Sequence, residues 1–295
     1  MPEKRMTAPR KGDRNPLMTT TLRPSGPIQS GADGAQHRAY DVCDNGRPVG
    51  AVDIATEPGP AGGAGLLRSL RIDEPVRRRG RGTIAALAAE EVLRGWGCTQ
   101  VRTEVAADNT AARRLAAALG YTERSRNMIK TLPSGPPALA EGLTARPMTP
   151  GEFAAWEERA IAAYAESLVT RGTSEATALE AARTSHARHL PDGLATEGAH
   201  LHLLIHDGEA VGHVWVARFE IHPGLLVGYV FDVEVHEEFR GRGYGRALML
   251  QAERIALAAG DERLGLHVVT ANTAAVRLYE SLGYEPSQYH LTKPL

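Results

Sequence analysis

The sequence predicts an α/β fold with a mixed sheet (the α+β layer type), present as two tandem copies of which the first is truncated. The 295 residues are enough for about two domains. When the sequence is shifted by 163 residues, 77–121 overlays 240–284 without a gap, and 18 of the 45 positions are identical. A repeat this long indicates a duplicated domain rather than a solenoid. The element pattern of the second copy, β-α-α-β-β-β-α-β-α-β, is typical of helices layered on a sheet.

Composition divides the chain into four segments. Residues 1–17 are polar and rich in proline, lysine and arginine, so we expect a disordered leader or a remnant left by cloning. Met18 offers a second possible start. The first copy is expected over 18–132 and the second over 143–295. Residues 133–142 are expected to form the linker, because proline and glycine are dense around them.

The second copy begins with a short strand over 142–149 and two amphipathic helices. A Thr-Pro pair opens the first helix, whose large apolar residues recur at helical spacing, namely Phe153, Trp156, Ile161, Tyr164 and Leu168. Thr173 or Ser174 caps the second helix. Trp156 and Tyr164 are expected in the core, and lining an acceptor cleft is the alternative for either.

The rest of the second copy alternates strands with two further helices. A hairpin is expected over 200–220, because the Asp-Gly pair within it is a preferred two-residue turn. A strand over 225–235 leads through a glycine-rich loop into a helix that ends near Ala259. A strand over 263–270 and a helix that Gly283 ends follow, and a last strand completes the domain.

The first copy keeps the later elements but has no room for the helix pair. Between the strands expected over 20–24 and 38–43 lie only about a dozen residues, too few for two amphipathic helices. This truncation is the main structural difference that we expect between the copies.

Composition also excludes several classes of function. The formal net charge is −1, so nothing indicates nucleic acid as the main partner. No apolar run approaches the length of a membrane span, and the first residues are too polar for a secretory signal. Cys43 and Cys98 could pair, but two cysteines in a chain this long favour reduced thiols. The histidine spacings miss the usual zinc patterns. We therefore expect a cytoplasmic protein without a metal site.

Glycine and arginine alternate where a strand gives way to a helix, in FRGRGYGRALM (239–249) and again in VRRRGRGTIAA (76–86). A helix N-terminus presents unpaired N–H groups and the positive end of the helix dipole. Glycines let the backbone approach a bulky anion and form a nest of N–H donors. Neither the Rossmann nor the P-loop spacing is present. The two loops predict pyrophosphate sites, and the alternative is a simple turn with solvated arginines.

The pattern R-x-x-G-x-G from Arg240, followed by the run NTAAVRLYESLGY from Asn272, resembles the GNAT acetyltransferase superfamily. The same two blocks recur in the same order in the first copy. The resemblance covers nearly all of 143–295 and the later two-thirds of 18–132. Two such domains in one chain also resemble the tandem enzyme mycothiol synthase, and the second copy alone resembles small bacterial acetyltransferases.

The resemblance implies acetyl-CoA as the acyl donor. In the family the pantetheine arm lies between the two central strands and the glycine loop holds the pyrophosphate. The implied cofactor residues of the second copy are Val233, Val235, Arg240, Gly241, Arg242, Gly243, Tyr244, Gly245, Arg246 and Asn272. A possible second cofactor site in the first copy comprises Arg77, Arg78, Arg79, Gly80, Arg81, Gly82 and Asn109.

Acyl transfer from a thioester to an amine needs a base for the amine, stabilisation of the oxyanion and an acid for the leaving thiolate. In the family the acid is usually a tyrosine on the helix after the fifth strand, and Tyr279 occupies that position. A phenol pKa of about 10 keeps such a group protonated; the alternative is a tyrosine packed in the core. The first copy has Ala116 there, which implies a degenerate domain that binds acetyl-CoA without using it or serves as a scaffold.

Three residues are candidates for the base. Asp232 and Glu234 alternate along one strand and so share a sheet face; they could instead hold a cationic substrate. His267 lies five residues before Asn272, where some relatives that acetylate protein N-termini carry a glutamate, and the first copy has Glu104 there. A histidine pKa of about 6.5 suits a base at neutral pH, and a buried structural histidine is the alternative. We rank Glu234 first, His267 second and Asp232 third.

The sequence therefore predicts an N-acetyltransferase that moves an acetyl group from acetyl-CoA to a primary amine, with the chemistry in the second copy. The acceptor could be a small metabolite, an antibiotic or a peptide. The alternative is a regulatory protein that binds acyl-CoA or another ligand through two inactive domains. Neither nucleic acid nor a membrane is an expected partner. The two copies could pack as a pseudo-dimer within a monomer, or the chain could form a homodimer.

Overall fold

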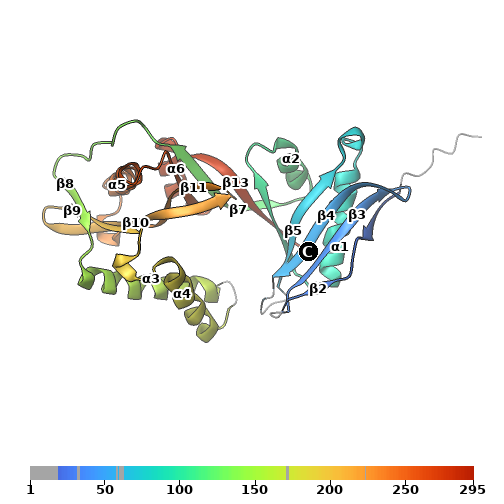
Figure 1. The fold of residues 1–295 in the computed structure, drawn as a ribbon, viewed down its shortest axis with the longest axis horizontal. Coiled ribbons are helices and arrows are strands. Elements are labelled where there is room, and N and C mark those ends of the chain that lie inside the picture. The colour runs from blue at the N-terminus through green and yellow to red at the C-terminus, as the bar shows by residue number, and fades with distance from the viewer. Residues whose placement is uncertain (1–18, 32–33, 58, 60–62, 171–172, 223) are drawn as a thin grey trace, which may run out of the picture.

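The computed structural model describes residues 19–295 except 32–33, 58, 60–62, 171–172 and 223. The expected leader and the alternative start at Met18 lie outside the described residues. Figure 1 shows two lobes joined by strands, one lobe built around the helices of each copy.

The second copy has the element order that the sequence predicts. In chain order its elements are β8 (Leu143–Pro147), α3 (Pro150–Thr170), α4 (Glu175–His189), η2 (Gly193–Ala195), β9 (His200–His206), β10 (Glu209–His222), β11 (Leu225–Val235), η3 (Glu237–Phe239), α5 (Tyr244–Ala258), β12 (Arg263–Val269), α6 (Thr273–Ser281) and β13 (Glu285–Pro294). Local chemistry explains two of the boundaries. Ser174 caps α4 by accepting from the Thr177 N–H at 3.4 Å. Asp207 and Gly208, with φ of +50° and +83°, make the tight turn between β9 and β10.

The first copy lacks the helix pair, as predicted. Its elements are β1 (Thr20–Pro24), β2 (Gln29–Ser30), β3 (Gln36–Asp44), β4 (Arg47–Glu57), β5 (Ala64–Ile72), η1 (Glu74–Val76), α1 (Arg81–Gly95), β6 (Gln100–Ala106), α2 (Thr110–Ala118) and β7 (Thr122–Thr131). Among the described residues before α1, the short turn η1 is the only helical element. The mixed sheet, the two copies and the truncation of the first are therefore confirmed.

One 13-stranded sheet passes through both copies in the order β1-β3-β4-β5-β6-β13-β7-β12-β11-β10-β9-β8, with β2 paired to β3. β13 of the second copy lies between β6 and β7 of the first copy. β7 of the first copy in turn pairs with β12 of the second. The copies have therefore exchanged their last strands. As a result the C-terminus lies in the lobe of the first copy, where the Leu295 N–H donates to the Thr99 carbonyl at 2.9 Å (Figure 1).

Two equivalent ion pairs hold the exchanged strands. Lys130 on β7 lies 2.6 Å from Glu253 on α5, and Lys293 on β13 lies 2.6 Å from Glu90 on α1. The glutamate side chains are only 1% and 4% exposed. The shift of 163 residues relates the two lysines to each other and the two glutamates to each other. Each copy's last strand therefore makes its buried contact with the helix of the other copy.

Apolar side chains pack on both faces of the second copy's sheet. α5 covers one face with a core that includes Leu248, Met249 and Leu266. α3 covers the opposite face, where Trp156 and Trp215 belong to one cluster. α3 and α4 pack on each other and form a roof, and no such helix pair occurs among the described residues of the first copy.

Candidate active site

The two central parallel strands of the second copy separate at one end. β11 pairs with β12 over three positions, of which Val230 opposite Leu266 is the last. Beyond this pair, 232–235 stays paired with β10, and 267–269 stays paired with β7. The edges of β11 and β12 that face each other there have no partner strand. Val233 and Val235 lie on this open stretch, so their main-chain groups border the gap.

The glycine-arginine loop follows β11 and begins α5. Gly241 and Gly243 have φ of +79° and +87°, which is a conformation that favours glycine. The first-turn N–H groups of a helix have no intrahelical partner, so the loop presents donors that suit an anion. Gly245 packs closely on α6, because a Cβ there would lie 3.2 Å from Cδ2 of Leu278.

The loop arginines are held to different extents. Arg240 donates from Nε to the Val235 carbonyl at 3.2 Å, and Arg246 donates to Ser281 Oγ at 2.5 Å. Arg242 is exposed on the loop itself. Because a guanidinium has five N–H donors, Arg240 and Arg246 keep donors for an anion after these contacts.

Two of the expected cofactor residues have contacts within the protein. Tyr244 is buried, and its hydroxyl lies 2.7 Å from Nδ1 of His206 on β9. Asn272 is the N-cap of α6, where its side chain accepts from the Ala275 N–H at 3.2 Å. These contacts fix the first turns of α5 and α6. A contact of either residue with a cofactor stays a prediction.

Tyr279 lies on α6 in the core that α5 covers, and it is 7% exposed. Burial raises the pKa of its phenol, and the charge of Asp232 raises it further. The hydroxyl is therefore protonated at neutral pH. No hydrogen bond among the described residues involves this hydroxyl.

A bulge in β11 turns Asp232 toward α3. The register with β10 shifts here and leaves Phe231 without an opposite residue. Asp232 accepts from Trp156 Nε1 at 3.2 Å and lies 2.8 Å from His213 Nε2. Burial alone would raise the pKa of Asp232, but the bonds from His213 and Trp156 outweigh burial and hold the pKa below its usual value.

Histidines and aromatic rings to which the sequence analysis gave no role surround this carboxylate. His213 is 4% exposed on β10, and Trp215 stacks on Phe231 with ring centroids 4.7 Å apart. His186 and His189 on α4 lie 6.0 and 6.4 Å from the Trp215 ring. Burial lowers the pKa of both α4 histidines. The alternation of His213 and Trp215 along one strand was the sequence signal that could have found them.

His267 is the first residue of β12 beyond its last pair with β11, and it lies on the face opposite α5. Its Nδ1 is 2.8 Å from Oδ1 of Asn127 on β7. An amide oxygen only accepts, so Nδ1 carries the proton and Nε2 carries the lone pair. Partial burial, together with His290 and Arg124, lowers the pKa of His267 to about 4. The ring is therefore neutral at pH 7.

The three base candidates have different surroundings. Asp232 is engaged by two donors beneath α3 and influences the pKa of Tyr279. Glu234 is exposed, and its carboxylate lies 3.5 Å from Arg240 of the loop. His267 contacts the exchanged strands β7 and β13. The charge of Asp232 therefore affects the pKa of the predicted acid, whereas Glu234 and His267 lie in separate groups of contacts.

The first copy keeps the separated strands and the loop with altered side chains. β5 pairs with β6 over three positions only. Gly80 begins α1 with φ of +75°, and Arg78 adopts φ of +59° where the second copy has glycine. Arg81 is buried and forms an ion pair with Asp44. Arg81 is therefore committed to the protein in the place where the second copy has a tyrosine.

The other predicted residues of the first copy repeat the structural contacts of the second. Arg77 donates from Nε to the Ile72 carbonyl at 2.7 Å, and Asn109 caps α2. Arg79 and Gly82 occupy the positions of Arg242 and Gly245. Ala116 is buried at the position of Tyr279, so this copy has no phenol there.

The model of the Acetyltransferase (GNAT) family matches residues 13–121 and 161–284, which together are more than half of the chain. The chain belongs to the GNAT acetyltransferase family. It is therefore an acyltransferase, and the enzymes of this family use acyl-CoA donors. Each match contains one glycine-arginine loop and one pair of separated strands.

Several relatives of the GNAT chain are similar over both copies. A mycothiol acetyltransferase of Thermobispora bispora is 35% identical over 214 residues, which are 70% of this chain and 68% of that protein. A mycothiol acetyltransferase of Amycolatopsis mediterranei is 27% identical over 289 residues, which are 95% and 89% of the two chains. A relative that matches only about half of the chain is an uncharacterized N-acetyltransferase of Bacillus subtilis, YdgE, 29% identical over 154 residues, which are 52% of this chain and 98% of that protein. The predicted resemblance to a tandem enzyme is confirmed.

Solved structures share the fold. A GCN5-related N-acetyltransferase from Sphaerobacter thermophilus has a TM-score of 0.56 at 23% identity, covering 87% of this chain and 80% of that one. A tandem GNAT protein from the clavulanic acid biosynthesis pathway has a TM-score of 0.52 at 20% identity, covering 90% and 85%. Among the described residues, no helix combines the length and apolar character needed to cross a membrane.

Proposed function

We propose that this GNAT chain transfers an acetyl group from acetyl-CoA to a primary amine, and that the second copy performs the reaction. Tyr279 is the observation that carries the proposal. Its phenol is buried, has a raised pKa and has no hydrogen-bond partner among the described residues. The equivalent Ala116 has no proton to give, and no roof like α3 and α4 is present among the described residues before α1.

The residues around the gap fit the proposed donor, which supplies an acetyl group activated as a thioester. The pyrophosphate suits the N–H groups of the loop and the first turn of α5, where Gly241 and Gly243 keep the backbone accessible. The guanidinium groups of the loop balance the charge of a polyphosphate. The open main-chain edge at Val233 and Val235 suits the amides of the pantetheine arm, as an extended peptide suits a sheet edge.

We assign the acid role to Tyr279 and favour His267 for the base. As the carbon–sulfur bond breaks, Tyr279 gives its phenolic proton to the sulfur. As the amine nitrogen bonds to the carbonyl carbon its N–H becomes acidic, so a weakly basic neutral imidazole can take the proton. Glu234, whose carboxylate forms an ion pair with Arg240, is the next candidate for the base. Asp232 is engaged by Trp156 and His213, so we assign it to orienting the acceptor.

The proposed acceptor site lies beneath the roof helices. Asp232 and Glu234 give this face negative charge, which attracts an ammonium group. A cavity of about 510 Å³ has His189 of α4 and Phe231, the residue before Asp232, in its lining. The relatives named mycothiol acetyltransferase make mycothiol-related amines the first acceptors to assay.

Replacement of Tyr279 with phenylalanine tests the proposal. Loss of a positioned general acid lowers turnover by roughly 100-fold or more, so Tyr279→Phe should slow release of free thiol to that extent. Its acetyl-CoA affinity, measured by titration calorimetry, should stay within about twofold, since the phenol contributes to the reaction rather than to ground-state binding. Tyr40→Phe, at a tyrosine on β3 of the first copy that is buried like Tyr279, is the matched control and should leave both values unchanged.

Two results would count against the proposal in different ways. Unchanged turnover in Tyr279→Phe would remove the acid role from this residue. A wild-type chain that binds acetyl-CoA but releases no thiol with any amine would favour the alternative, a regulatory protein with two inactive domains.

A further inference from the structure

Asn127 belongs to the first copy, yet it contacts the candidate site of the second copy. The strand exchange makes this possible, because β7 lies directly beside β12 and puts Asn127 opposite His267 in the register. At the equivalent place of the first copy, Glu104 on β6 lies 3.3 Å from His290 on β13. The shift of 163 residues relates His267 to Glu104 and His290 to Asn127. The two pairs are equivalent contacts that carry different chemistry.

A chain of side-chain amides connects the two pairs across four strands. His267 Nδ1 lies 2.8 Å from Asn127 Oδ1, and Asn127 Nδ2 donates to Gln288 Oε1 at 3.1 Å. Gln288 Nε2 then donates to Glu104 Oε2 at 2.8 Å. The hydrogen bond from His290 holds the pKa of Glu104 below its usual value, so Glu104 is ionised and only accepts.

The carboxylate at one end sets the direction of every bond in this chain. Since Glu104 accepts, Gln288 must present its NH₂ to Glu104 and its oxygen to Asn127. Asn127 must then present its NH₂ to Gln288 and its oxygen to His267. His267 can only donate to that oxygen, so its proton is on Nδ1. The first copy thereby determines which nitrogen of His267 holds the lone pair.

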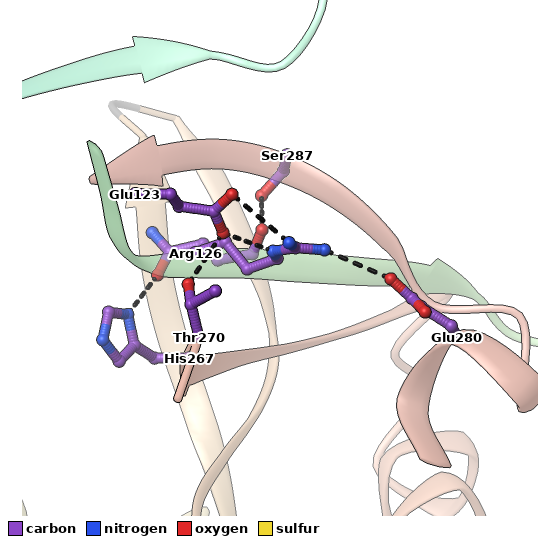
Figure 2. Close-up of polar contacts among 7 residues, drawn as sticks. Glu123, Arg126, His267, Thr270, Glu280 and Ser287 are labelled. Atoms are coloured by element: carbon purple, nitrogen blue, oxygen red, sulfur yellow. Dashed lines mark hydrogen bonds and ion pairs between the residues drawn. The ribbon is translucent and has the colours of Figure 1, made fainter. Parts of the chain in front are cut away.

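The residue before Asn127 ties β7 to the helix that carries Tyr279. Arg126 Nη1 donates to Glu280 on α6 at 3.2 Å, and its Nε donates to Glu123 at 2.6 Å (Figure 2). Thr270, just after β12, donates to the same Glu123 at 2.9 Å (Figure 2). Two successive residues of β7 thus contact both elements that carry the proposed acid and the proposed base.

We propose that Asn127 is a positioning residue for the active site of the second copy, which is incomplete without the first copy. Asn127 holds His267 in the Nδ1–H form, and this leaves the Nε2 lone pair for the acceptor amine. The inference rests on the proposed function, because it takes from that proposal the role of His267 as the base. It assigns the degenerate first copy a role in catalysis that requires no reaction in that copy.

Burial lowers the pKa of His267 most, and titratable groups on β7, β13 and β6 add to or oppose this effect. Arg124 on β7 and His290 on β13 lower its pKa, whereas Glu104 on β6 raises it. Asn127 carries no charge, so its removal changes the preferred site of the proton more than the charge near the ring. The tautomer of His267 is therefore the property to measure.

The test uses the full chain labelled with ¹⁵N at its histidine rings. Two-bond ¹H–¹⁵N spectra report which nitrogen of each imidazole is protonated, and His267→Gln identifies the signals of that ring. Wild type should show the Nδ1–H form at pH 7. Asn127→Leu should shift His267 toward the Nε2–H form that free imidazole side chains prefer, and should lower kcat/KM for a working amine roughly tenfold, the effect of one lost hydrogen bond.

Two further variants separate positioning from packing. Thr122→Val removes a 3.3 Å hydrogen bond to the Thr292 carbonyl between β7 and β13 without touching the site, so it should change neither the tautomer nor kcat/KM. Asn127→Asp keeps an acceptor for Nδ1–H, so the tautomer should persist. The added negative charge should raise the pKa of His267, and the acid limb of the pH–rate profile should move to higher pH.

The outcomes separate this inference from the proposed function. An unchanged His267 tautomer in Asn127→Leu overturns the inference, and so does a changed tautomer with undiminished kcat/KM. In both cases the assignment of Tyr279 stands on its own test. A wild-type chain that acetylates no amine overturns the proposed function, while a tautomer change in Asn127→Leu would still support control of His267 by the first copy.

Discussion

Lys293→Met removes the cation that β13 brings to the helix of the other copy. Lys293 lies 2.6 Å from Glu90, whose side chain is 4% exposed. After the substitution the partner that remains for Glu90 is the Tyr121 hydroxyl at 2.9 Å. Removing one member of a buried ion pair costs about 3–5 kcal/mol because the other charge stays buried. A domain is stable by only about 5–15 kcal/mol, so we expect a large loss.

Urea unfolding measures this loss. The midpoint should fall with little change in the slope, which would show that the native state keeps its compactness. Lys130→Met, at the equivalent pair with Glu253, should cost a similar amount because that glutamate is as deeply buried. The double variant Glu90→Gln/Lys293→Met should regain part of the stability, since no uncompensated charge remains. A loss below about 1 kcal/mol in both single variants would refute the reasoning, because a value that small is typical of solvated surface pairs.

Three further predictions concern the loop and two buried groups. Gly243→Ala forces alanine into φ of +87° at the start of α5, so acetyl-CoA binding measured by calorimetry should weaken. The equivalent variant of the first copy, Gly80→Ala, should leave turnover unchanged. Burial lowers the pKa of His202 to about 4, so the unfolded chain binds a proton at this residue more tightly than the folded chain does. The free energy of unfolding should therefore fall as pH drops from about 6.5 toward 4. In urea unfolding at several pH values, His202→Gln should flatten that slope. Trp156→Phe removes a donor from Asp232, so the pKa of that carboxyl should rise in a ¹³C NMR titration.

Periodicity and spacing were enough to predict the element order of both copies. Helix and strand periods, the Asp-Gly turn and the glycine loops are local signals, and the structure has all of them. The strand exchange was not predicted, because β7 and β13 occupy equivalent positions in the two copies and share the lysine that faces a buried glutamate. Lys130 and Lys293 occupy the same position, as do Glu90 and Glu253, so the ion pair alone does not determine which strand packs on which helix. Only the course of the linker and the competition between whole sheets distinguish the two arrangements.

The candidate site also has parts that local sequence patterns indicate and parts that depend on contacts between distant residues. The glycine loop follows from a residue pattern within one copy, and the role of Tyr279 is what the resemblance to the GNAT family implies; both roles stay predictions. The partner of His267 is Asn127, which is 140 residues away and becomes a neighbour only through the exchange. The bulge that turns Asp232 toward His213 is another long-range effect, because it appears in the register of β11 with β10 and not in the residues of β11 alone.

The exchange also bears on why an altered first copy is present at all. The last strand of each copy lies in the sheet of the other copy, so neither part of the sheet is built from one copy alone. Loss of the first copy would remove β7, which pairs with β12 on the side away from β11. Asn127 and the Arg126 contact with α6 would be lost with it. A change such as alanine at 116 affects chemistry in the first copy alone, whereas a change on β7 affects the second copy. Structural demands on β7 therefore persist whether or not the first copy binds a cofactor.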